Sequence, residues 1–307
     1  MISRKFTIWA CGLLFVFGSC AEDMVKPIEN DKDAPGTVQD VKTESLPGAV
    51  KFTYTLPSDP DLLYVLAKYT NKTGKVMEFR SSFYTNSVTV EGFGDTDTYK
   101  VELYTVDRSE NRSQPQIVEV VPLTPPILSC YESLSMVSDF GGMTFEMDNK
   151  FKSDLAIYVC TPDELGDMVL AETFYSAREE IVYSVRGYDA VPRRFGIFLQ
   201  DKYGNETDTL FTELTPIYER ELDKTKFREM YLQNDSRVDS YDGKMEYVWN
   251  GRISKDGDSG GVGLHTGTGT KDGPAVFTFD LGVLAKLSRF ALWAIQDEKH
   301  FYNDMSP

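Results

Sequence analysis

The sequence predicts an all-β protein that contains tandem β-sandwich domains. The first indication is an alternation of apolar and polar residues, in which Val50, Phe52 and Tyr54 alternate with Lys51 and Thr53. Such alternation is typical of strands with one buried face. The second indication is an internal repeat, because strand-like segments return after a constant interval along the chain. The third is that no sustained helical period occurs within residues 37–217.

Residues 1–19 predict a cleaved export signal. Arg4 and Lys5 precede the apolar stretch from Ile8 to Phe17, which is too short for a membrane-spanning helix of about 20 residues. Small residues then lead directly to Cys20, as in the lipobox of bacterial lipoproteins. We therefore expect the Cys20 thiol to carry the lipid anchor; an ordinary secretory signal with a chance cysteine is the alternative.

Residues 20–34 are polar and predict a tether, since nothing in them can build a core. Glu22 and Asp23 lie directly behind Cys20. Acidic residues at this place resemble the surface-export signal of Bacteroidota lipoproteins. The resemblance implies a lipid-anchored protein of the outer membrane that faces the cell exterior.

A repeat of about ninety residues predicts two sandwich domains, residues 35–122 and 123–217. The segment 99–111 returns at 193–205, an offset of 94 residues. Both copies of this segment contain the pattern Asp-x-x-x-Asn. This pattern predicts a hairpin turn, because Asp and Asn side chains can bond back to their own backbone.

The first copy contains the strand pattern Gly48-x-Val50-x-Phe52-x-Tyr54-x-x-Pro57, followed by Tyr99-x-Val101 before the last hairpin. In this pattern it resembles a fibronectin type III module. The resemblance implies a seven-stranded, immunoglobulin-like sandwich. The copy departs from the family in lacking a tryptophan on its second strand.

Residues 218–307 contain three short motifs in order: Trp249-Asn250-Gly251, His265-Thr266 and Phe279-Asp280-Leu281-Gly282. In these motifs the segment resembles a discoidin (coagulation factor type C, galactose-binding-like) domain. The resemblance implies a jelly-roll sandwich. Asn250 stands where the family usually has Asp, and the chain ends at Pro307, about half-way through an ordinary domain, so we expect a partial domain of a longer gene product. Residues 222–232 fit either a short helix or an extended linker.

The order of lipobox, two sandwiches and a discoidin-like segment is similar to that of surface lipoproteins of Bacteroidota polysaccharide-utilisation, or starch-utilisation-like, systems. Those proteins are regarded as non-catalytic accessories that bind glycan. The resemblance implies a glycan ligand and the outer-membrane uptake machinery as partners.

The charge balance excludes two classes of partner. The chain has 48 acidic and 32 basic residues, a net charge of −16. Nucleic acid and anionic lipid would be repelled by such a surface. We therefore expect no nucleic-acid partner and contact with the membrane through the lipid anchor alone.

Cys130 and Cys160 are the two cysteines left in the exported chain beside Cys20. They could form a disulfide in an oxidising envelope. A buried thiol at Cys160 is an equal alternative, because this residue follows the apolar alternation Leu155, Ile157, Val159.

No catalytic residues are predicted. One segment matches the sequence of the nucleophile loop of chymotrypsin-like proteases, Gly257-Asp258-Ser259-Gly260-Gly261. That family supplies its histidine before the serine, whereas both histidines of this chain follow Ser259. We interpret the segment as a glycine-rich loop.

The predicted ligand-binding residues cluster near the start of the discoidin-like segment. A sugar ring can stack on an aromatic face while polar side chains bond its hydroxyls. The candidates are Trp249, Asn250, Arg252, His265 and Thr266. Trp249 could instead be a core residue, as we expect of Trp293, and Tyr241 and Tyr247 are alternative stacking platforms.

No cofactor is expected, with a structural calcium ion as an open alternative. Discoidin-like glycan binders often hold calcium through carbonyls and Asp side chains. The loop residues that could serve here are Asp239, Asp242, Asp256 and Asp258. The histidines and cysteines show no zinc-binding spacing.

Together these observations favour a non-catalytic, cell-surface lipoprotein that binds glycan for a polysaccharide-uptake system. The alternative is a protein-binding adhesion or scaffold subunit of an outer-membrane complex, because fibronectin-like and discoidin-like folds both serve adhesion. An enzyme is the third hypothesis, which no motif favours.

Overall fold

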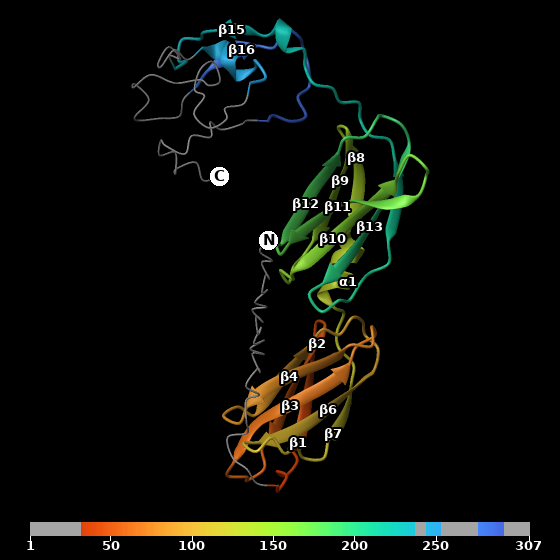
Figure 1. Cartoon of the computed structure of the whole chain (residues 1–307), viewed down its shortest axis with the longest axis vertical. Helices are drawn as coiled ribbons and strands as arrows, with labels where there is room; N and C mark the ends of the chain where they lie inside the picture. Colours follow the sequence, from red (N-terminus) through yellow and green to blue (C-terminus); the bar gives the residue numbers. More distant parts are fainter. Residues whose placement is uncertain (1–31, 237–243, 253–275, 292–307) are drawn as a thin grey trace, which may run out of the picture. The chain divides into compact units, whose positions relative to one another are not determined.

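The computed structural model describes residues 32–236, 244–252 and 276–291 and contains two β-sandwiches in succession (Figure 1). By its contacts, the chain divides into two compact units. One unit joins the first sandwich with the short segments Lys150–Leu155 and Gln200–Thr207; the other holds the remainder of the second sandwich and the C-terminal segment. No helix of the described residues is long and apolar enough to span a membrane.

The first sandwich consists of a three-stranded and a four-stranded antiparallel sheet. The three-stranded sheet has the order β1-β2-β5 and the four-stranded sheet the order β4-β3-β6-β7. This division of seven strands is that of an immunoglobulin-like or fibronectin type III-like sandwich. The strands are β1 (Gln39–Leu46), β2 (Ala49–Thr55), β3 (Leu62–Thr70), β4 (Val76–Ser82), β5 (Ser87–Glu91), β6 (Tyr99–Asp107) and β7 (Gln116–Val120).

The alternating pattern of the sequence accounts for the core of this sandwich. Val50 and Phe52 on β2 are fully buried, as are Val101 and Leu103 on β6, while the polar residues between them face outward. An aromatic group closes one end of the core, where Tyr69 packs against other rings at centroid distances between 4.4 and 6.5 Å. The predicted all-β sandwich is therefore confirmed for this copy.

The second sandwich repeats the arrangement strand for strand. Its sheets have the orders β8-β9-β12 and β11-β10-β13-β14. The last two strands begin 94 residues after their counterparts in the first sandwich, which is the offset found in the sequence. The strands are β8 (Ser135–Asp139), β9 (Gly142–Asp148), β10 (Leu155–Pro162), β11 (Met168–Ser176), β12 (Glu180–Arg186), β13 (Arg193–Asp201) and β14 (Leu210–Leu214).

The Asp-x-x-x-Asn pattern forms the same hairpin turn in both copies. Asp107 Oδ1 accepts hydrogen bonds from two backbone amides of its own turn at 2.8 Å, and Asn111 Nδ2 donates to Asp107 Oδ2 at 2.9 Å. Asp201 and Asn205 make the equivalent bonds at 2.8 to 2.9 Å. One carboxylate thus fixes the turn between the last two strands of each sandwich.

We expect Asp107→Ala to lower the free energy of unfolding by about 2 kcal/mol, because it removes three hydrogen bonds to a fully buried carboxylate. Urea denaturation followed by circular dichroism measures the change. Asp163→Ala is the matched control, since Asp163 also accepts from two amides of its own turn but is exposed to solvent. Equal losses in the two variants would contradict this account of the turn.

A helix between the two sandwiches was not predicted. Helix α1 (Pro126–Ser133) begins at Pro126, a residue favoured at the first helical position because its missing amide hydrogen is not needed there. Ile127 and Cys130 are three residues apart and both buried. Two turns are too short for a helical period to stand out in the sequence.

The described part of the C-terminal segment holds little regular structure. Two short strands, β15 (Arg228–Met230) and β16 (Thr278–Asp280), pair in antiparallel fashion. Two 3-10 helices accompany them, η1 (Lys224–Lys226) and η3 (Met245–Val248). For residues 222–232, the sequence left a short helix and an extended linker as alternatives, and the structure shows a 3-10 turn followed by a short strand. The discoidin-like jelly roll stays a prediction.

Candidate functional site

A cavity of about 610 Å³ lies in the C-terminal segment, between η1 and η3. Asp223 caps η1, because its carboxylate accepts hydrogen bonds from the amide and the hydroxyl of Thr225 at 3.1 and 2.6 Å. These two bonds hold the pKa of Asp223 below its usual value. The cavity is lined by Lys224, Thr225, Glu246, Tyr247, Trp249, Asn250 and Gly251.

An aromatic cluster supports one wall of this cavity. Trp249 packs against Phe227 at 5.7 Å, with the rings nearly perpendicular, and against Phe279 at 5.1 Å. Met245, in the adjoining 3-10 turn, is fully buried. Trp249 itself is only half-buried, and it both contacts this small core and lines the cavity.

The residues after Trp249 form a tight polar turn. The amide of Arg252 donates to Asn250 Oδ1 at 2.8 Å, and Gly251 has a φ of +77°, a backbone conformation that favours glycine. The turn brings Asn250 and Gly251 to the cavity. Arg252 is exposed and is not among the residues that line it.

The charged groups around the cavity are paired within the segment. Lys224 Nζ lies 2.5 Å from Glu221 Oε1, and this hydrogen bond and the positive charge of Lys224 hold the pKa of Glu221 below its usual value. Lys244 Nζ lies 3.8 Å from Glu246 Oε1 and also above the ring of Tyr247, 5.9 Å from its centroid. The described lining residues therefore combine two half-buried aromatic residues with one lysine and one glutamate, each of which has an ion-pair partner.

The structure brings together two of the five predicted binding residues at the cavity, Trp249 and Asn250, together with the alternative platform Tyr247. Arg252 follows directly along the chain. Cys20, the predicted site of lipidation, lies outside the described residues. The remaining residues singled out in the C-terminal segment also lie outside them: Asp239, Tyr241, Asp242, Asp256, Asp258, Ser259, His265, Thr266 and Trp293.

Within the described residues, no group of three or more His, Cys, Asp or Glu side chains could hold a metal ion. The calcium alternative stays a prediction, because its four candidate ligands all lie outside them. No disulfide joins Cys130 to Cys160 in the structure. Cys130 is buried on α1, and Cys160 is half-buried on β10, where burial raises the pKa of its thiol.

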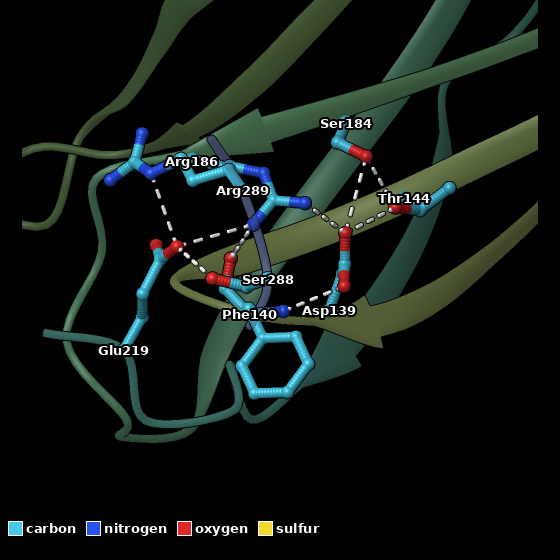
Figure 2. A network of polar contacts seen from close by, with 8 residues as sticks. All are labelled: Asp139, Phe140, Thr144, Ser184, Arg186, Glu219, Ser288 and Arg289. Atoms are coloured by element: carbon cyan, nitrogen blue, oxygen red, sulfur yellow. Dashed lines mark hydrogen bonds and ion pairs between the residues drawn. The ribbon is translucent and has the colours of Figure 1, made fainter. Parts of the chain in front are cut away.

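Sequence reasoning missed a polar network centred on Glu219, shown in Figure 2. The Glu219 carboxylate accepts a hydrogen bond from Ser288 Oγ at 2.6 Å and lies 3.1 Å from Arg289 Nε. Arg186, at the end of β12, bridges Glu219 and Asp139, with nitrogen–oxygen distances of 3.5 and 2.9 Å. The network fastens residues 288 and 289 to the second sandwich.

Asp139 is the most fully bonded member of this network. Its Oδ2 accepts from the hydroxyls of Thr144 and Ser184 at 2.8 and 3.2 Å, and its Oδ1 accepts from the amide of Phe140 at 2.8 Å (Figure 2). Burial by itself raises the pKa of Asp139, but these hydrogen bonds and the charge of Arg186 outweigh it and hold the pKa below its usual value. The carboxylates of the network are thus already satisfied by protein groups, which is typical of a structural cluster.

Three family models match successive parts of the chain. Residues 35–122 match a domain of unknown function (DUF4959), and residues 123–225 match a second (DUF5126). Residues 249–307, which include the described wall of the cavity from Trp249 onward, match a third domain of unknown function. No curated protein matches the chain.

Several solved structures are similar to the chain. The SusE-like protein BT2857 shares 28% identity over 53% of this chain and 57% of that one, with a TM-score of 0.32. A two-domain fibronectin type III segment of chicken tenascin shares 12% identity over 58% of this chain and 99% of that one, with a TM-score of 0.28. The central fibronectin III array of RIM-binding protein shares 8% identity over 62% and 71%, with a TM-score of 0.25. The chain thus spans little more than half of the SusE-like protein.

Proposed function

We propose that the chain is a non-catalytic, glycan-binding lipoprotein of the outer membrane, anchored through Cys20 and exposed on the cell surface. The cavity at Trp249 is the observation that carries the proposal. Trp249 and Tyr247 line this cavity together with Asn250 and Thr225. Aromatic rings suit stacking on a sugar ring, and polar groups suit hydrogen bonds to its hydroxyls.

The remaining parts of the chain fit this role. The lipobox and the polar tether would attach the protein to a membrane, and the tandem sandwiches would serve as spacers before the binding segment. One of the similar solved structures is that of a SusE-like protein, which agrees with the resemblance of the sequence to lipoproteins of starch-utilisation-like systems. Association with outer-membrane uptake machinery is part of the proposal.

Replacing Trp249 by alanine is expected to weaken glycan binding at least about tenfold, because it removes the ring that borders the cavity. Affinity gel electrophoresis of the mature full chain against a panel of polysaccharides identifies a ligand, and calorimetry then compares the variants. Since Trp249 also supports a small core, Tyr247→Ala is measured in parallel, because Tyr247 lines the cavity outside the Phe227–Phe279 cluster.

Tyr231→Ala is the control for these variants, since Tyr231 lies in the same segment, is 57% exposed and does not line the cavity. Circular dichroism checks whether each variant keeps its fold. Unchanged affinity in both Trp249→Ala and Tyr247→Ala would place the glycan elsewhere and contradict the proposal.

A protein-binding role is the second candidate, and the hairpin between β10 and β11 favours it. Leu165 is 87% exposed, and Met168, Val169 and Leu170 at the start of β11 are 39 to 56% exposed. β11 is also an edge strand of its sheet, and an exposed apolar edge is a common protein contact. Failure to bind any glycan, together with co-purification of a transporter component, would favour this role.

A further inference from the structure

The charges at the Trp249 cavity point to a particular class of glycan. Among the described residues that line the cavity, Lys224 is the one cation and Glu246 the one anion. Lys224 is already occupied by Glu221 at 2.5 Å, and Glu246 lies 3.8 Å from Lys244. The two charged residues among the described lining residues therefore each have an opposite charge within the same segment.

An anionic sugar would bind poorly to this arrangement. A carboxylate or sulfate group is usually held by an arginine fork or an available lysine, because its lost hydration has to be replaced by charge-assisted hydrogen bonds. None of the described lining residues is arginine. An anion that used Lys224 would compete with Glu221 for it and would share the cavity with the Glu246 carboxylate.

The net charge of the chain also disfavours anionic ligands. The whole chain carries a net charge of −16, so its long-range field repels anions. Residues 218–307 contain 15 acidic and 12 basic residues, so the binding segment does not reverse that field. Stacking and hydroxyl hydrogen bonds, by contrast, need no net charge.

We infer that the cavity selects neutral glycans and discriminates against uronate-bearing or sulfated ones. This inference rests on the proposed function and specifies the substrate class of the same site. Recognition then depends on Trp249, Tyr247 and the polar groups beside them. Among the described lining residues, Lys224 and Glu246 each face an opposite charge, so an acidic substituent would compete with a carboxylate for Lys224.

The test compares polysaccharides that differ only in charge. Dextran is paired with carboxymethyl dextran, and methyl-esterified homogalacturonan with its de-esterified form, each against the mature full chain by affinity electrophoresis and calorimetry. The neutral member of a bound pair is expected to bind at least tenfold more tightly. Its affinity should change less than about twofold between 10 and 150 mM salt, because no ion pair forms on binding.

A Glu221→Gln variant sharpens the test by releasing Lys224 from its carboxylate. We expect this variant to bind the acidic member of a pair about threefold to fivefold more tightly than the native chain does, the range that an exposed ion pair supplies. Glu229→Gln is the control, because Glu229 is exposed and bonded to Tyr231 away from the cavity.

The results of these binding experiments distinguish the selectivity for neutral glycans from glycan binding itself. Tighter binding of the acidic member by the native chain, weakened by salt, overturns the neutral selectivity and leaves glycan binding intact. Equal affinity for both members also overturns the selectivity. Failure to bind any glycan of a broad panel overturns the proposed function, and this inference with it.

Discussion

Replacement of Phe52 by alanine is expected to lower the free energy of unfolding of the first sandwich by about 3–5 kcal/mol. Phe52 is fully buried in the centre of β2, among the largest side chains of the core. Phe145 occupies the equivalent place on β9, where it contacts Phe174 at 5.5 Å and Tyr183 at 6.0 Å. Phe145→Ala is therefore expected to have an effect of the same size on the second sandwich.

Urea denaturation of the full chain, followed by far-ultraviolet circular dichroism, measures both losses. All three tryptophans of the chain lie outside residues 35–217, so their fluorescence does not report directly on the sandwiches. Phe151→Ala is the matched control, because the Phe151 side chain is 52% exposed and its removal should cost less than about 1 kcal/mol. A loss at Phe52 no larger than that at Phe151 would show that Phe52 is not part of a close-packed core.

Replacement of Arg186 by alanine is expected to cost about 2–3 kcal/mol. It removes the cation between Asp139 and Glu219, whose side chains are 24% and 11% exposed. Breaking a fully buried pair costs more, but here Glu219 keeps Arg289 and Ser288 as partners. Arg186→Lys should recover part of the loss, because it keeps the charge without the planar fork that reaches both carboxylates.

The same network makes part of the stability depend on pH. The pKa of Asp139 is lower in the folded chain than its usual value near 4, which the unfolded chain has. Its contribution is therefore complete above pH 4 and is lost as the pH falls through the folded pKa. Stability measured from pH 6 down to pH 3 should fall less steeply in Arg186→Ala than in the native chain.

Arg80→Ala serves as the control for the network. The ion pair of Arg80 with Glu78 has a distance of 3.8 Å, and the two side chains are 61% and 37% exposed. Such surface pairs contribute about 0–1 kcal/mol. If Arg186→Ala costs no more than Arg80→Ala, Glu219 does not depend on Arg186 for its position.

The two sandwiches could be predicted from sequence because period-two alternation and the repeat are local signals. Val50, Phe52 and Tyr54 face inward as the pattern requires, and the Asp107 and Asp201 turns recur at the same offset of 94 residues. Helix α1 could not be predicted from the sequence, because its two buried residues are too few to show a helical period. Its one strong signal is Pro126 at the first position.

The cavity was predictable in part, since the aromatic and polar residues at its wall are adjacent in the sequence. Trp249 and Asn250 follow one another, and Tyr247 precedes them by two residues. The Glu219 network was not predictable, because its members come from segments up to about 150 residues apart and no spacing rule joins them. A single Glu after a sandwich domain resembles any surface carboxylate of an acidic chain.

The last residues of β5 and β12 make equivalent contacts with later parts of the chain. Glu91 and Arg186 hold equivalent places, since each pairs with the first residue of the neighbouring strand. Glu91 accepts a hydrogen bond from Tyr203, whereas Arg186 holds Glu219. Gly48 and Gly141, both with a φ of +63°, leave room at the same corner for the chain that follows. The same position of the three-stranded sheet thus holds a residue from farther along the chain in both copies, through an acid in the first copy and a base in the second.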